Sequence, residues 1–163
     1  MKVSVLRLGH RNVRDDRVTT HIALVARAMG ADRIFMTEVN NSIKTTMEEV
    51  ISGWGGRYFD IEIIENWKAV AMNWKSTGGK IVHLTMYGVN IDSVADELRE
   101  CDDNILIVVG ASKVPRETYE IAALAICLDR IFNGKELTKQ FDDAKIRIVP
   151  SPNGKKVMKY EHN

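Results

Sequence analysis

ILIVVGASKVPRETYEIAALAICLDRIFNG, residues 105–134, holds the features that decide the fold. An apolar run at 105–109 ends at Gly110, and a second apolar segment of helical character follows almost at once. The first run shows no alternation of polar and apolar residues, as expected for a strand that is covered on both faces of a parallel sheet. A glycine at a strand end permits a positive φ or the close approach of a ligand. The stretch therefore predicts a buried strand, a turn that could hold something small and polar, and a helix.

The same alternation extends outward through the whole chain. Apolar, β-branched runs lie at 3–8, 33–37, 59–64, 80–86, 105–110 and 144–150. Between them apolar residues recur at helical spacing, for example Ile22, Val25, Ala26 and Met29. Alternating strands and helices favour an α/β fold with parallel strands and crossover helices. We expect one domain over residues 1–163, with a mostly parallel sheet flanked by helices.

Composition excludes several classes of protein. A content of 45% hydrophobic and 28% charged residues is ordinary for soluble domains. No apolar run reaches the length needed to cross a bilayer, and an arginine at position 7 interrupts any signal-peptide core. The two cysteines lack CxxC spacing, which favours a reduced, intracellular protein. The four histidines do not combine with cysteines or acids at metal-ligand spacing, so no metal site is expected.

The net charge of +1 conceals a basic segment at the N-terminal end. Residues 1–33 carry seven Lys or Arg against three Asp. In RLGHRNVRDDRVTTH, residues 7–21, arginines recur every three or four positions directly after the first predicted strand. The planar guanidinium matches the geometry of phosphate oxygens. Two interpretations remain open, a phosphate-binding loop and a solvated loop with local Arg–Asp pairs.

Ligands of open α/β sheets bind beyond the carboxyl ends of the strands. The positions to consider therefore follow Leu8, Met86 and Gly110. VVGASKVP, residues 108–115, offers the donors Ser112 and Lys113 but matches neither GxGxxG nor GxxxxGK[ST]. Neither a dinucleotide nor a P-loop phosphate site is supported, and a plain strand-to-helix turn stays an equal alternative.

Five blocks of the chain resemble the archaeal tRNA ribose 2′-O-methyltransferases that modify the cytidine at position 56 of the T-loop, which belong to the SPOUT, or α/β-knot, class. The blocks are VLRLGHRNVRDDRVTTHIALVARAMGA, VHLTMYG, GASKVP, AALAICLDRIFNGKEL and IVPSPNGKKV, in family order across essentially the full length. The resemblance implies methylation of a tRNA ribose with S-adenosyl-L-methionine, a C-terminal trefoil knot, and a cytoplasmic homodimer without membrane attachment. A SPOUT enzyme with another RNA target and an unrelated α/β nucleotide-binding domain remain alternatives.

The resemblance also carries expectations for individual residues. Backbone groups of three loops hold the cofactor in that family, and an arginine lies near the reacting 2′-hydroxyl. Arg17 is our preferred catalytic residue, with Arg14 second, because Arg17 lies nearest the start of the predicted helix. Arg7, Arg11 and His21 are expected to hold RNA. The cofactor positions that correspond here are Leu84, Gly110, Ala111, Ser112, Lys113, Val114, Ile121 and Ala122.

At the place of the third cofactor loop, this sequence differs from the family. Members carry a further strand and an Asn-Gln-Pro-His-Ser-Glu-like loop just before AALA, whereas here RETYE runs directly into IAALAI. Six residues, 111–116, span at most about 20 Å when fully extended, too little for an extra strand and a threaded return. Either the polypeptide carries a loop that this sequence lacks, which we favour, or the chain is a shortened relative that binds RNA without catalysis.

Overall fold

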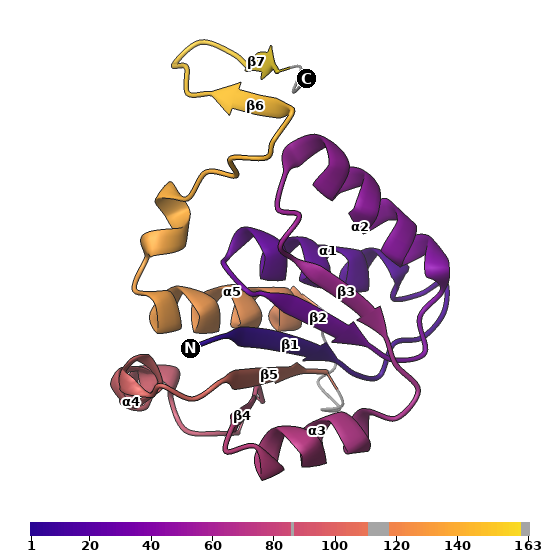
Figure 1. Ribbon diagram of the computed structural model, residues 1–163, viewed down its shortest axis with the longest axis vertical. Helices are drawn as coiled ribbons and strands as arrows, with labels where there is room; N and C mark the ends of the chain where they lie inside the picture. Colours follow the sequence, from indigo (N-terminus) through magenta and orange to yellow (C-terminus); the bar gives the residue numbers. More distant parts are fainter. Residues whose placement is uncertain (86, 111–117, 161–163) are drawn as a thin grey trace.

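The computed structural model describes residues 1–85, 87–110 and 118–160. Its main sheet has five parallel strands in the order β3-β2-β1-β5-β4 (Figure 1). The predicted α/β class with a mostly parallel sheet is thus confirmed. The strands of this sheet are β1 (Val3–Arg7), β2 (Arg33–Met36), β3 (Asp60–Ile63), β4 (Lys80–His83) and β5 (Ile105–Val109).

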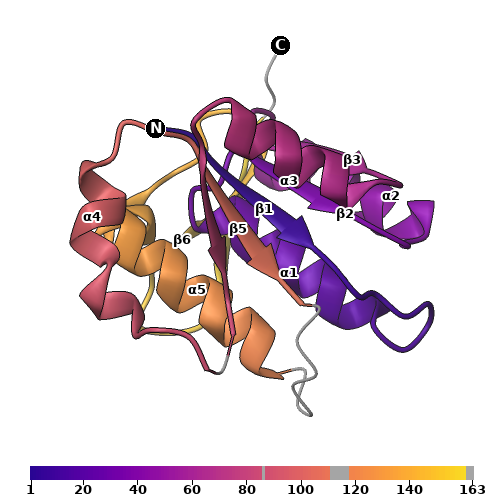
Figure 2. The ribbon, with the colours of Figure 1, turned by 90° about the horizontal axis from the view of Figure 1, so that it is seen from below.

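Helices cover both faces of this sheet. Figures 1 and 2 show α1, α2 and α5 on one face and α3 on the other. The helices are α1 (Asp16–Ala28), α2 (Asn41–Trp54), α3 (Trp67–Ser76), α4 (Ala95–Glu100) and α5 (Thr118–Phe132), with short 3-10 turns η1 (Ile91–Ser93) and η2 (Lys135–Thr138).

The central strands divide their side chains between two apolar layers. On β1, Val5 belongs to the larger cluster under α1, α2 and α5, while Leu6 belongs to the smaller cluster under α3. On β5, Ile107 and Leu106 divide in the same way. Successive side chains of a strand point to opposite faces, so a strand buried on both sides must be apolar at every position. This explains the uninterrupted apolar run at 105–109.

The C-terminal segment departs from the predicted alternation. Residues 144–150 do contain a strand, β6 (Ile146–Val149), but it does not join the main sheet. It pairs antiparallel with β7 (Lys156–Lys159) in a separate two-stranded ribbon. The two strands are joined by a short turn that contains Gly154 at φ +77°, and such a local connection favours antiparallel pairing over a crossover. The strand expected within residues 144–150 is therefore present, but it lies outside the parallel sheet.

The segment in which the trefoil knot is expected lies partly outside the described residues. Among the described residues no strand after β5 joins the main sheet, and α5 is the next element. Residues 111–117, which connect β5 to α5, lie outside the described residues. In the described ranges, no helix has both the length and the apolar character that a bilayer crossing requires.

Candidate active site at the carboxyl edge of the sheet

The carboxyl ends of β1, β5 and β4 lie side by side, with β5 in the middle (Figure 2). Backbone hydrogen bonds continue one step past the strands, since Leu8 N donates to Val109 O at 2.9 Å and Leu84 N donates to Val108 O at 3.0 Å. These bonds bring the residues that follow the three strands to one edge. The strand-end rule pointed to the residues that follow Leu8, Met86 and Gly110. Leu8 and Gly110 lie together at this edge, whereas Met86 and residues 111–117 lie outside the described residues.

Gly110 closes this edge at a position where only glycine fits. Its φ is +94°, and an added Cβ would lie 2.2 Å from the Leu8 carbonyl oxygen and 2.4 Å from Nη1 of Arg7. His83 donates from Nε2 to the Gly110 carbonyl oxygen at 3.1 Å. The glycine is therefore required by close packing of the chain on itself at the end of β1.

Arg7 is a buried cation directly beneath this edge. Its side chain is only 3% exposed. Nη1 donates to the Leu8 carbonyl oxygen at 2.9 Å and lies 2.9 Å from Oε2 of Glu120, while Nε donates to the Thr19 hydroxyl at 3.3 Å. A buried charge requires such partners because desolvation is costly. The guanidinium thus joins β1, α1 and α5, and it is not presented to solvent as an RNA contact would require.

His10 extends this network to the start of α1. Its Nδ1 lies 2.9 Å from the Thr19 hydroxyl and its Nε2 lies 3.2 Å from Oδ1 of Asp16. Arg7 already donates to the Thr19 oxygen, so the hydroxyl proton is available for Nδ1. His10 Nε2 is buried and makes no hydrogen bond within the described residues, so its closeness to Asp16 is an electrostatic contact only. The side chains fix the loop between β1 and α1 against the helix.

Arg11 and Asp15 form the local pair that the second interpretation of the basic segment anticipated. Asp15 is 1% exposed and accepts from the backbone N and from Nε of Arg11, both at 2.9 Å, and from Nη2 at 3.2 Å. The hydrogen bond from the Arg11 side chain lowers the pKa of Asp15, against the opposing effect of burial. Arg11 is 55% exposed, so part of its side chain still faces solvent.

Arg14, Arg17 and His21 are exposed beside this loop. Arg17 and His21 both belong to α1 and are four residues apart, so they share one face of the helix. Within the described part of the chain, Arg17 makes neither an ion pair nor a side-chain hydrogen bond. The basic segment therefore contains the buried Arg7, which builds the loop, and arginines with exposed side chains, which a ligand can reach.

The cofactor positions expected from the resemblance are met only in part by described residues. Leu84 and Gly110 lie at the edge, as described above. Ala111, Ser112, Lys113 and Val114 lie outside the described residues. Ile121 is half-buried against the core, and Ala122 is exposed. Both belong to α5, which runs without a break from Thr118 to Phe132, so the place of the third cofactor loop is helical here.

Glu120 is a site residue that the sequence reasoning did not select. An acid in the first turn of a helix is common because it complements the helix dipole, so its position carried no distinctive signal. Its closeness to Arg7 results from the packing of α5 against α1 and β5. Among the described residues there is no group of three or more His, Cys, Asp or Glu that could hold a metal ion.

Residues 54–158 match the family model described as tRNA ribose 2′-O-methyltransferase, aTrm56. A protein of Nitrosopumilus maritimus named tRNA (cytidine(56)-2′-O)-methyltransferase is 50% identical, with 96% of each chain covered. A protein of Methanocaldococcus jannaschii with the same name is 45% identical, with 100% of this chain and 99% of that one covered.

The solved structures support the fold. The crystal structure of the A. aeolicus TrmH/SpoU tRNA modifying enzyme has a TM-score of 0.54 at 15% identity, with 83% of this chain and 75% of that chain covered. At such low identity the likeness concerns the fold alone, which is that of SPOUT enzymes.

The match to the M. jannaschii protein also reveals a difference in length. The alignment has 180 positions and takes in all 163 residues of this chain, so 180 − 163 = 17 of its positions have no residue here. Seventeen residues would be sufficient for a further strand and loop.

Proposed function

The chain belongs to the tRNA ribose 2′-O-methyltransferase family, and from this we propose that it methylates the ribose 2′-hydroxyl of cytidine 56 in tRNA, using S-adenosyl-L-methionine. The observation that carries the proposal is identity of 45 to 50% to relatives with that named activity over nearly the whole chain. The exposed Arg14, Arg17 and His21 beside the carboxyl edge of the sheet support it, because the two arginines offer cations and His21 an imidazole where the fold presents its ligand site.

Of the three proposed cofactor loops, the described residues include the beginnings of two. The ends of β4 and β5 bring Leu84 and Gly110 to one edge. At the third position α5 is continuous, and the N–H of Ala122 is used by the helix itself rather than left for a ligand. When bound, S-adenosyl-L-methionine supplies an electrophilic methyl group, so the protein needs no electrophile of its own.

What remains for the chain is to place and polarise the ribose hydroxyl. We assign Arg17 to the 2′-oxygen, where its charge would stabilise the developing alkoxide. An arginine is a poor general base because its pKa is too high, so a substrate phosphate is the acceptor we propose for the proton. Arg14 and His21 would hold neighbouring phosphates, and orientation of the hydroxyl supplies much of the rate enhancement.

A methyl-transfer assay tests this proposal. Unmodified tRNA transcript is incubated with the chain and labelled S-adenosyl-L-methionine, and the digested nucleosides are identified by mass. We expect 2′-O-methylcytidine from position 56 alone. A tRNA with 2′-deoxycytidine at position 56 is the matched control and should take up no methyl group. Methylation of that control, or of another nucleotide, would contradict the assignment.

The shorter chain favours one second candidate, a tRNA-binding protein without methyl transfer. Seventeen aligned positions have no residue here, and we propose that they correspond to the expected cofactor-loop segment between Glu120 and Ala122. The first experiment to distinguish the methyltransferase from the non-catalytic tRNA-binding protein is a measurement of the intact mass of the purified protein. A mass near 18.4 kDa would show that the chain has no additional segment. If that protein binds tRNA but calorimetry detects no binding of S-adenosyl-L-methionine, the second candidate is established. A heavier protein that binds the cofactor would exclude it.

Assembly and location follow from the proposed substrate. We propose a single-domain homodimer in the cytoplasm, because tRNA is modified there and a dimer would present two basic edges. The trefoil knot belongs to the same proposal and requires the additional segment.

A further inference from the structure

The β6–β7 ribbon carries a concentration of positive charge. The segment 144–160 contains five basic residues and no Asp or Glu, although the whole chain has a net charge of only +1. All four residues of β7 are exposed. A local excess of cations on a near-neutral body favours a polyanion met at that place. The basic residues are Lys145, Arg147, Lys155, Lys156 and Lys159.

The ribbon lies apart from the candidate active site. Figure 1 shows it beyond the end of α2, on the side of the molecule away from α3 and β4. Lys145 N donates to Gly53 O at 3.0 Å and so attaches the segment to α2, while Tyr160 N donates to Lys145 O at 2.7 Å within the segment itself. The acids just before it are partly engaged, because Asp143 accepts from the backbone N of Gly56 and of Arg57.

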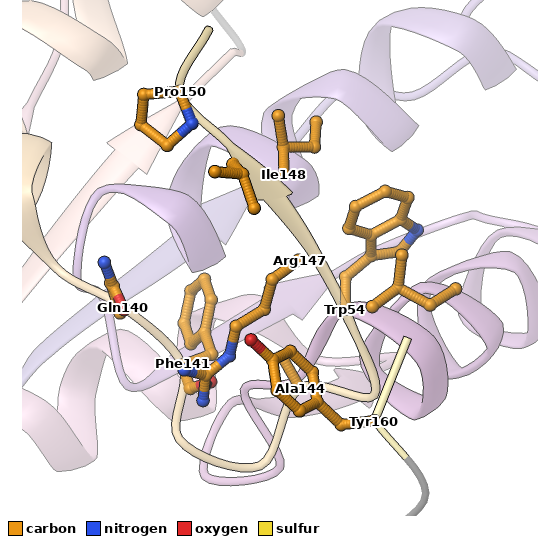
Figure 3. Close-up of a pocket in the computed structure, with 10 residues that line it drawn as sticks. Trp54, Gln140, Phe141, Ala144, Arg147, Ile148, Pro150 and Tyr160 are labelled. Carbon is orange, nitrogen blue, oxygen red and sulfur yellow. Dashed lines mark hydrogen bonds between the residues drawn. The ribbon is translucent and has the colours of Figure 1, made fainter. Parts of the chain in front are cut away.

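A cavity of about 430 Å³ lies between the ribbon and the end of α2. Figure 3 shows Trp54, Phe141 and Tyr160 around it, with the Arg147 side chain extending between the last two rings. Volumes of roughly 300–1,000 Å³ are typical of small-ligand sites. The cavity therefore has the size and the aromatic lining for a planar ligand.

Arg147 supplies the polar part of this lining. Its guanidinium lies 5.2 Å from the centre of the Tyr160 ring and donates to the Phe141 carbonyl oxygen at 3.1 Å. Its Nε has no hydrogen-bond partner within the described residues, so the lining contains a donor that lacks an acceptor. Aromatic rings together with an arginine are the means by which proteins hold unstacked bases of RNA.

We propose that this cavity takes one unstacked base of the tRNA, while lysines of the ribbon contact the flanking phosphates. The inference rests on the proposed function, because that function supplies the RNA. The exposed apolar side chains of Ile148 and Met158 could also suit a second copy of the chain. A two-fold interface made by this ribbon would bring its cations near those of the second copy with no acidic residue of the segment to offset them, and that repulsion favours RNA.

The salt dependence of tRNA binding tests the phosphate contacts. Lys156→Ala combined with Lys159→Ala should reduce the slope of log K against log salt by about 1 to 2, because each lost phosphate contact removes roughly one released counterion. The matched control replaces two exposed lysines of α3, Lys68→Ala and Lys75→Ala, and should leave the slope unchanged.

Substitution at Tyr160 tests the base site. Tyr160→Ala should weaken tRNA binding about tenfold, the loss expected for one base stack, while Tyr160→Phe should retain most of the affinity. The melting temperature of each variant shows whether the fold is intact, since Tyr160 is 38% exposed and is not part of the core.

The outcomes separate this inference from the function on which it depends. If the unaltered chain shows no salt-sensitive tRNA binding, the proposed function fails and this inference with it. If tRNA binds but the ribbon and Tyr160 variants equal the unaltered chain, the inference is overturned and the function stands. If those variants instead dissociate a dimer in sedimentation and keep tRNA affinity per chain, the ribbon is an interface between copies and the inference is also overturned.

Discussion

Nη1 of Arg7 lies 2.9 Å from Oε2 of Glu120, and the two side chains are only 3% and 16% exposed. This pair joins the end of β1 to the first turn of α5, directly beneath the edge where the cofactor is proposed to bind. Because a buried charge without its partner is costly, the pair couples the stability of the fold to the shape of that edge.

Arg7→Met should lower the free energy of unfolding by about 3 kcal/mol or more. The substitution removes a buried cation, so the Glu120 carboxylate loses the positive charge beside it. Glu120→Gln should cost less, since the amide oxygen keeps a partial negative charge near the guanidinium and the variant leaves no carboxylate buried. Urea unfolding of both variants and of the double variant measures the coupling. A loss below about 1 kcal/mol for Arg7→Met would show that the pair contributes little.

Gly110→Ala should lower the free energy of unfolding by about 2–4 kcal/mol, because the new Cβ would need a positive φ and would clash with the Leu8 carbonyl oxygen. Gly78→Ala is the matched control, with φ +85° but nothing within 4 Å of the added Cβ. It should cost only about 1 kcal/mol, the strain of the backbone alone. Equal losses for the two variants in urea unfolding would show that the close approach at Gly110 is not significant.

Asp15 should make the protein sensitive to acid. Its pKa is lowered in the folded state by the Arg11 hydrogen bond, so its contribution is complete above the unfolded pKa of about 3.9 and is lost as the pH falls through the lower folded value. Asp15→Asn should cost about 1–2 kcal/mol at pH 7. The difference from the unaltered chain should shrink below about pH 4. Urea unfolding at several pH values measures this, and a difference independent of pH would contradict it.

Arg17→Ala should lower kcat for methyl transfer about 100-fold with little change in tRNA affinity, if it stabilises the developing alkoxide. Arg14→Ala should mainly weaken tRNA binding, as expected for a phosphate contact. Single-turnover rates and filter binding on the same tRNA transcript separate the two effects. Retention of full methyl transfer by Arg17→Ala together with its loss in Arg14→Ala would reverse the assignment.

The two cysteines should react at very different rates with a thiol reagent. Burial raises the pKa of the Cys127 thiol to about 12, and its side chain is 1% exposed, whereas Cys101 is half-buried. In native protein at pH 8 we expect Cys101 to react first and Cys127 only through unfolding, because the thiolate is the reactive form. Colorimetric thiol counting with and without urea tests this, and rapid reaction of both would show that the core under α5 opens easily.

The sequence by itself determined the architecture of the main sheet. The uninterrupted apolar run at 105–109 predicted a strand buried on both faces, and the alternation of strands and helices predicted parallel pairing. Both follow from local patterns, since side-chain period and chain connectivity can be seen along the sequence. The same rule about strand ends selected Leu8 and Gly110, which meet in the structure.

Only the tertiary structure decided what each basic residue does. The arginines at 7, 11, 14 and 17 are alike in sequence, yet Arg7 is buried on Glu120, Arg11 is held by Asp15, and Arg17 is exposed. The tertiary structure also shows that the last predicted strand lies outside the main sheet, in a separate two-stranded ribbon next to an aromatic cavity. The physical reason is that burial and ionic partners depend on segments far apart in the chain, and no local pattern contains those distances.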